Sequence, residues 1–92
     1  MKIIIWDMEV FKYNTLLGAI VLEGNERKIY QTWDLNQIKN FYEEHKNDIW
    51  VGHNSQEYDS LILQSILDNS DPYLRSKEII TNNLINVNNF LF

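Results

Sequence analysis

The sequence predicts one small α/β domain, and three observations support this prediction. The chain has 92 residues, the length of a single domain, and 45% of them are hydrophobic, enough to build a core. Short β-branched and aromatic runs are interspersed with segments in which apolar residues recur at helical spacing. The chain has no cysteine, which excludes disulfide scaffolds, cysteine zinc sites and thiol nucleophiles.

Three strands are expected at the beginning of the chain. They are the apolar run 2–7, the Leu- and Ile-rich run 15–23, and residues 27–33. Residues 10–14 are expected to form a turn. Gly24-Asn25 supplies a hairpin turn, because both residue types tolerate positive φ. Consecutive strands joined by short turns predict an antiparallel meander.

Helical signals follow the meander. Asp34 is a suitable N-cap, and Gln37 three residues later completes a capping-box pattern. The helix is expected to end near residues 46–47, before a short strand over 48–52. Two further helices are expected, the first over 58–67 and the second from Asp71-Pro72 toward residue 82.

The expected order is therefore βββαβαα, with two to three helices. A helix between the third and fourth strands makes a crossover, so the fourth strand should lie parallel to the first. Both strands then end at the same edge of the sheet. That edge is the expected position of a functional site.

The charge pattern bears on partners. The net charge is −5, and residues 34–71 hold eight acidic and two basic side chains. This segment is either a solvated acidic helix face or a surface that competes with DNA for a basic groove. Since no apolar run approaches the roughly 18 residues of a spanning helix, we expect a soluble, cytoplasmic protein with no membrane partner.

Three carboxylates are the candidate site residues. Asp7 and Glu9 are two residues apart at the end of the first strand, so they should point to the same side. Asp59 stands at the start of the helix after the fourth strand, where the helix dipole tolerates a carboxylate. If the two strands are neighbours, the three side chains converge. Oxygen ligands of this kind suit Mg²⁺ or Mn²⁺, which can support phosphodiester hydrolysis.

Two motifs carry a family resemblance. Trp6-Asp7-Met8-Glu9 resembles the first motif of DEDD-type 3′→5′ exonucleases, an Asp-x-Glu at the end of strand one. Asn54 four residues before Tyr58-Asp59 resembles the second motif. The chain thus looks like the first part of the proofreading domain of phage-type DNA polymerases, which has a ribonuclease-H-like fold. The resemblance assigns residues 1–82 to a truncated domain of that kind and leaves 83–92 as a weak strand or tail.

The resemblance implies roles for these residues. Asp7 would bridge two metal ions, Glu9 and Asp59 would each hold one, and Asn54 would position the 3′ end of single-stranded DNA. The family's third motif, Tyr or His followed by a further Asp, has no counterpart here. Because that motif supplies the fourth carboxylate and the general base, it stays undecided whether the chain is an enzyme by itself.

Simpler interpretations exist for the same residues. Asp7 and Asp59 can serve as turn and helix caps, Glu9 can be solvated, and Asn54 can form an Asx turn. His53 and His45 are expected to have structural roles, with His45 near a helix C-terminus. The tryptophans are expected in the core, with Trp33 or Phe11 as an alternative exposed contact patch.

Two classes of function remain open. The first is the metal-binding half of an exonuclease that acts on the 3′ end of single-stranded DNA. The second is a small phage or mobile-element protein that keeps the half-fold and binds a basic protein, as an anti-CRISPR-like inhibitor of a host nuclease does. Phe90-Leu91-Phe92 would need apolar cover, so a homo-oligomer is a further alternative.

Overall fold

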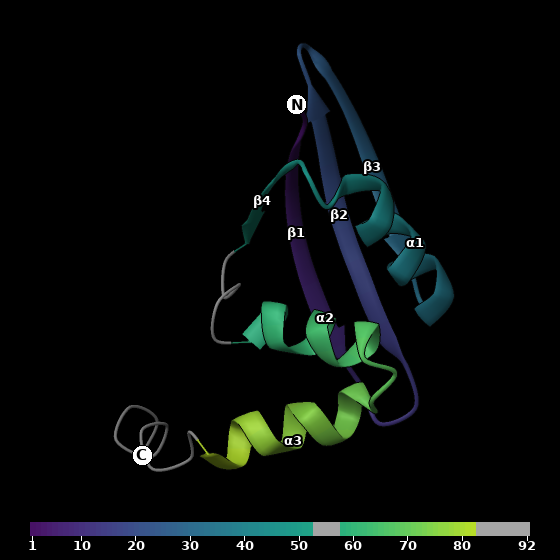
Figure 1. Cartoon of the computed structure of the whole chain (residues 1–92), viewed down its shortest axis with the longest axis vertical. Helices are drawn as coiled ribbons and strands as arrows, with labels where there is room; N and C mark the ends of the chain where they lie inside the picture. The colour runs from purple at the N-terminus through teal and green to yellow at the C-terminus, as the bar shows by residue number, and fades with distance from the viewer. Residues whose placement is uncertain (53–57, 83–92) are drawn as a thin grey trace.

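The computed structural model describes residues 1–52 and 58–82. A four-stranded sheet and three helices form the fold (Figure 1), with the elements β1 (Ile3–Val10), β2 (Thr15–Glu23), β3 (Glu26–Thr32), α1 (Leu35–His45), β4 (Ile49–Gly52), α2 (Ser60–Leu67) and α3 (Pro72–Asn82). The expected βββαβαα order is confirmed. Residues 83–92, expected to form a weak strand or tail, lie outside the described residues.

The sheet has the strand order β3-β2-β1-β4. β1 and β2 pair antiparallel, as do β2 and β3, while β4 pairs parallel with β1. Helix α1 carries the chain from the β3 edge to the β4 edge, and this is the expected crossover. In the parallel register Trp6 pairs with Gly52, so β4 ends beside the residue that precedes Asp7.

β1 is longer than the sequence predicted. The strand was expected to end at Asp7 but continues to Val10, because Asp7–Val10 pair in register with Thr15–Gly18 of β2. The turn between the two strands is correspondingly tight, and the Phe11 N–H donates to the Asn14 carbonyl at 2.8 Å. Asp7 and Glu9 therefore lie within a paired strand.

Helix α1 begins at the expected N-cap but lacks the full capping box. A side-chain oxygen of Asp34 accepts from the N–H groups of Asn36 and Gln37 at 2.8 and 3.1 Å. Gln37 does not close the box, because its side chain accepts from the hydroxyl of Thr32. The same hydroxyl accepts from the N–H of Asp34, which takes over the second half of the cap.

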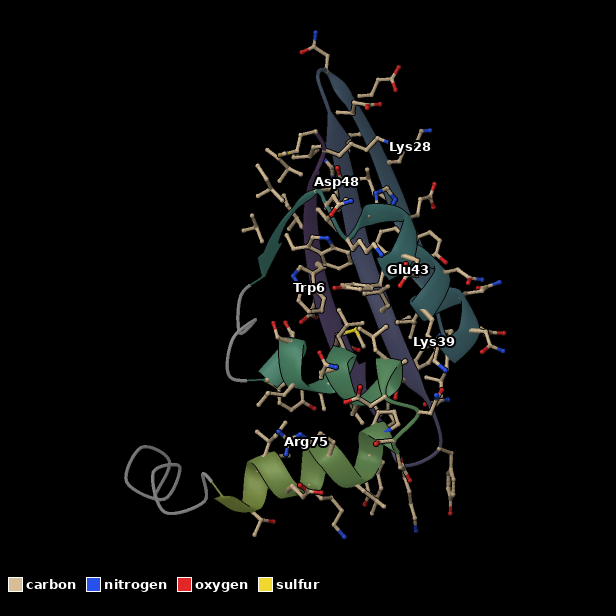
Figure 2. The ribbon with its side chains drawn as sticks, in the orientation of Figure 1. Trp6, Lys28, Lys39, Glu43, Asp48 and Arg75 are labelled. Carbon is tan, nitrogen blue, oxygen red and sulfur yellow. The ribbon has the colours of Figure 1, made fainter. Side chains whose placement is uncertain are left out.

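One face of the sheet, which we call the covered face, packs against the helices. The core contains Ile4, Trp6 and Met8 of β1, Leu17 and Ala19 of β2, and apolar residues of all three helices. Figure 2 shows Trp6 near the middle of the molecule and Lys39 and Glu43 along α1. Trp6 meets Trp50 edge to face, with ring centroids 5.1 Å apart.

The opposite face of the sheet, which we call the open face, has no described helix packed on it. β1 has a strictly alternating burial pattern from Ile3 to Glu9, so the odd-numbered residues lie on this side. Strand register places Ile29, Ile20, Ile5 and Val51 in one row across all four strands. The helices of the described residues are thus gathered on one side, as Figure 1 shows.

Candidate functional site

Asp7 and Glu9 both lie on the open face. Both side chains are exposed, as the alternation in β1 requires, and the expectation that they share a side is met. Among the described ion pairs, none involves either carboxylate. The carboxyl end of β1 thus presents two solvent-facing carboxylates two residues apart.

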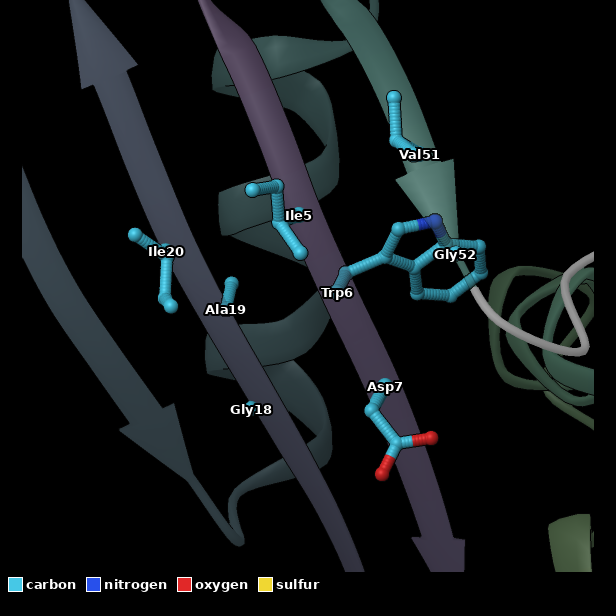
Figure 3. A pocket seen from close by; sticks show the side chains of 8 residues that line it. All are labelled: Ile5, Trp6, Asp7, Gly18, Ala19, Ile20, Val51 and Gly52. Atoms are coloured by element: carbon cyan, nitrogen blue, oxygen red, sulfur yellow. The ribbon is translucent and has the colours of Figure 1, made fainter.

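A shallow groove of about 520 Å³ runs beside Asp7 (Figure 3). Its walls come from β1, β2 and β4, and its lining residues are Ile5, Trp6, Asp7, Gly18, Ala19, Ile20, Val51 and Gly52. Gly18 pairs directly with Asp7 across the strands, and a Cβ built there would meet nothing within 4 Å. The missing side chain at Gly18 therefore leaves room for a ligand next to the Asp7 carboxylate.

Asp59 lies in a different environment. Its residue surface is 1% exposed, and it occupies the N-cap position of α2, a helix on the covered face. Its backbone is helical, with φ −58° and ψ −44°, and its side chain does not cap the α2 N–H groups. The simpler interpretation of Asp59 as a helix cap is therefore not supported.

The expected convergence of three carboxylates is not present as a formed cluster. Within residues 1–52 and 58–82, no group of three or more His, Asp or Glu side chains is placed to hold a metal ion. Asp7 and Glu9 supply two oxygen donors on one face, and Asp59 is buried. Asn54, expected to position a DNA end, and His53 lie outside the described residues.

The side chains of His45 and Asp48 form a hydrogen-bonded titratable pair. His45 ends α1, is buried, and has Nδ1 2.9 Å from Asp48 Oδ2. This contact and the Lys2 N–H, 3.1 Å from Asp48 Oδ1, hold the pKa of the Asp48 carboxyl below its ordinary value of 3.8. Figure 2 shows Asp48 where the chain passes from α1 to β4. The pair ties these two elements together, consistent with the expected structural role of His45.

Aromatic residues gather at the end of the sheet that carries Glu9. Phe11 follows β1 and Trp33 follows β3, and their ring centroids are 6.0 Å apart with a 40° tilt. Phe11 is 50% exposed and Trp33 51%, so the sequence alternative of an exposed patch is confirmed and Trp33 is not a core residue. Gly18 was not among the residues expected at a site, although a lone glycine inside a strand signals close approach of another group.

Comparison with known proteins identified no relative of this chain. The chain matches no protein-family model, no curated protein and no solved structure. No helix in the part of the chain that the structure describes is long and apolar enough to cross a membrane.

Proposed function

We propose that this domain supplies the metal-binding first half of a 3′→5′ exonuclease site that acts on single-stranded DNA. The observation that carries the proposal is the position of Asp7 and Glu9. They lie two residues apart on the open face of β1, and the parallel strand β4 ends at Gly52 beside Trp6, the residue before Asp7. Two solvent-facing carboxylates with no ion-pair partner among the described residues fit the oxygen preference of Mg²⁺ or Mn²⁺.

The described residues supply only part of the set of oxygen ligands expected for a divalent metal ion. Asp7 and Glu9 are available, while Asp59 would have to approach them from its buried position at the start of α2. A bound divalent ion would supply an activated water and charge stabilisation for phosphodiester hydrolysis. The residues of this chain would hold that ion, and the groove beside Gly18 would give a substrate access to it.

A nuclease assay tests the proposal. The purified chain is incubated with 5′-labelled single-stranded DNA in Mn²⁺, alongside Asp7→Ala and Glu44→Ala. Glu44 is an exposed carboxylate of α1 and provides the matched control. We expect slow shortening from the 3′ end that is lost in Asp7→Ala and retained in the control.

Isothermal titration with Mn²⁺ accompanies the assay. The proposal requires Mn²⁺ to bind in a way that depends on Asp7 and Glu9. Binding without shortening would place the remaining ligands outside the described residues. The absence of both binding and shortening, or equal losses in Asp7→Ala and Glu44→Ala, would contradict the proposal.

A second candidate function is protein binding through the open face. The apolar row across the four strands favours it, since Ile29 in that row is 72% exposed and Ile5 is 42% exposed. The net charge of −5 favours a basic partner, such as a nuclease that the domain would inhibit.

Mutations distinguish the two candidate functions. Ile29→Arg should abolish binding to such a nuclease in a titration with the purified partner, whereas Asp7→Ala should leave that binding nearly intact. The reverse pattern, with metal binding lost in Asp7→Ala and no titratable protein partner, would favour the exonuclease half-site.

A further inference from the structure

We propose that the outer edge of β4 pairs with the same edge of a second copy of this chain, antiparallel and about a two-fold axis at Trp50. The strand order places β4 at one border of the sheet and β3 at the other (Figure 1). The contact is made by backbone groups and does not involve the two carboxylates, so it is independent of the proposed function and can be tested separately.

Backbone geometry shows which groups of β4 face outward. The Ile49 N–H donates to the Lys2 carbonyl, just before β1, at 2.9 Å. In a strand the N–H and C=O of one residue point to the same side, and successive residues alternate. Trp50 and Gly52 therefore direct their N–H and C=O groups away from β1, where no described strand pairs with them. Another extended backbone offers donors and acceptors at the same spacing, so these groups select a β-strand as the partner.

The two borders of the sheet differ in their protection against such pairing. β3 carries three consecutive charged residues, Glu26, Arg27 and Lys28, which oppose the addition of a further strand. β4 has no charged residue and no proline, and its continuous register with β1 shows no bulge. Within the part of the chain that the structure describes, the short length of β4 is its only protection.

A second copy satisfies both the backbone and the side chains of β4. Residues directly opposite each other in an antiparallel pair share a face, so an axis at Trp50 places Ile49 opposite Val51 of the second copy. The two Trp50 residues then exchange N–H···O=C bonds in both directions. Ile49 and Val51 are each 49% exposed on the open face, and the pairing brings these apolar side chains of the two copies together.

The charges around β4 favour an uncharged strand as the occupant. The net charge of −5 opposes self-association in general, but β4 itself has no charged side chain. The carboxylate of Asp48, just before the strand, is already bonded to His45 Nδ1 and to the Lys2 N–H. A charged strand from another protein thus finds no counter-charge on β4, whereas β4 of a second copy needs none.

The size of the contact sets its strength. Four residues of edge bury far less than the roughly 800 Å² per partner of a standard interface, so we expect a weak dimer that forms only at high protein concentration.

Cysteine cross-linking tests the register, because the chain has no cysteine of its own. Ile49→Cys and Val51→Cys chains are purified separately, mixed at high concentration and oxidised. Directly opposite residues have Cα atoms about 4.5–5.5 Å apart, within the range of a disulfide. We expect a disulfide-linked dimer in the mixture. Each variant alone should remain unlinked, because its two cysteines lie on a diagonal, about 7–8 Å apart.

Sedimentation equilibrium with lysine variants separates edge pairing from contact through the open face. Ile49→Lys places a charge on the β4 edge and should abolish the dimer. Ile29→Lys is the matched control, because Ile29 is also an exposed isoleucine on the open face but lies in β3, at the other border of the sheet. This control should dimerise like the parent.

Several results would overturn the proposal. They are no linked dimer in the oxidised mixture, equal linkage in each single variant, or loss of the dimer in Ile29→Lys as well as in Ile49→Lys. The last result would indicate contact through the open face. Circular dichroism monitors folding of each variant. If Ile49→Lys does not fold, Gly52→Pro provides the same test, because it removes an outward N–H and no bond to β1.

Discussion

The two faces of the same sheet differ in what their side chains do. On β1, Ile4, Trp6 and Met8 are buried against the helices, whereas Ile5 and Asp7 between them face the open side. A strand with period-two alternation can thus give one set of residues to stability and the interleaved set to a site. Residues adjacent in sequence on β1 should therefore have very different mutational effects.

The largest effect is expected for a pair of isoleucines one residue apart. Ile4 is 0% exposed, so Ile4→Ala should lower the free energy of unfolding by about 2–5 kcal/mol, from lost burial and the cavity left behind. Ile5→Ala should cost about 1 kcal/mol or less, since its side chain already contacts solvent. Urea denaturation of both variants measures the difference.

Equal costs for the two isoleucines would contradict this difference between the two faces of the sheet. That result would mean that the open face is covered in solution by a second copy or by another segment. Sedimentation at two protein concentrations, carried out on the same samples, would distinguish a second copy from cover within the chain.

A smaller effect is expected at the beginning of α1, one of the helices on the covered face. Asp34→Ala removes the acceptor for two helix N–H groups and should cost about 1 kcal/mol. Asn40→Ala, at an exposed position in the middle of the same helix, controls for helix propensity. A cost for Asp34→Ala no greater than that of the control in thermal unfolding would show that the Thr32 hydroxyl can maintain the cap alone.

Substitution of Gly18 on the open face should raise the stability of the fold, whereas the substitutions above should lower it. Gly18→Ala should raise the free energy of unfolding by about 0.4–1 kcal/mol, because it restricts the unfolded chain and meets no atom in the folded one. A loss of stability would indicate that another group approaches the strand at Gly18. The variant also narrows the groove beside Asp7, so Mn²⁺ titration should be repeated on it.

Removal of the Asp48 carboxylate should change how the free energy of unfolding depends on pH. The pKa of Asp48 is lower in the folded chain than its ordinary value of 3.8, so the pair with His45 stabilises the fold above that pH. The contribution is lost as pH falls through the lowered folded pKa. Stability of the parent and of Asp48→Asn should therefore differ at neutral pH and converge in acid. Curves that stay parallel down to pH 2 would contradict this role.

Much of the fold could be predicted from local patterns. The bounds of β2 agree with the apolar run, and the Asp34 cap and the parallel β4 follow from the residues that surround them. The capping box failed because the Thr32 hydroxyl competes for the Gln37 side chain, a tertiary contact that spacing does not reveal. Which face is covered could not be predicted either, because Ile3, Ile4 and Ile5 give both faces of β1 the same apolar character.

The candidate site was also partly predictable from local patterns. Alternation alone placed Asp7 and Glu9 on one side, and the structure confirms that placement. Whether Asp59 comes near Asp7 and Glu9 depends on the path of the chain between β4 and α2, which local spacing does not determine. The meeting of Phe11 and Trp33 depends on the register of three strands, so sequence could name the pair only as an alternative.

The location of a bound Mn²⁺ ion would show whether the open face is the functional side of the sheet. Paramagnetic broadening of amide signals in a ¹H–¹⁵N NMR spectrum reports which residues lie near the ion. We expect broadening centred on Asp7, Glu9 and Gly18, with the distant β2–β3 turn at Gly24 unaffected. Broadening centred on the acidic residues of α1 instead, or no selective broadening at all, would contradict the assignment of the open face as the functional side of the sheet.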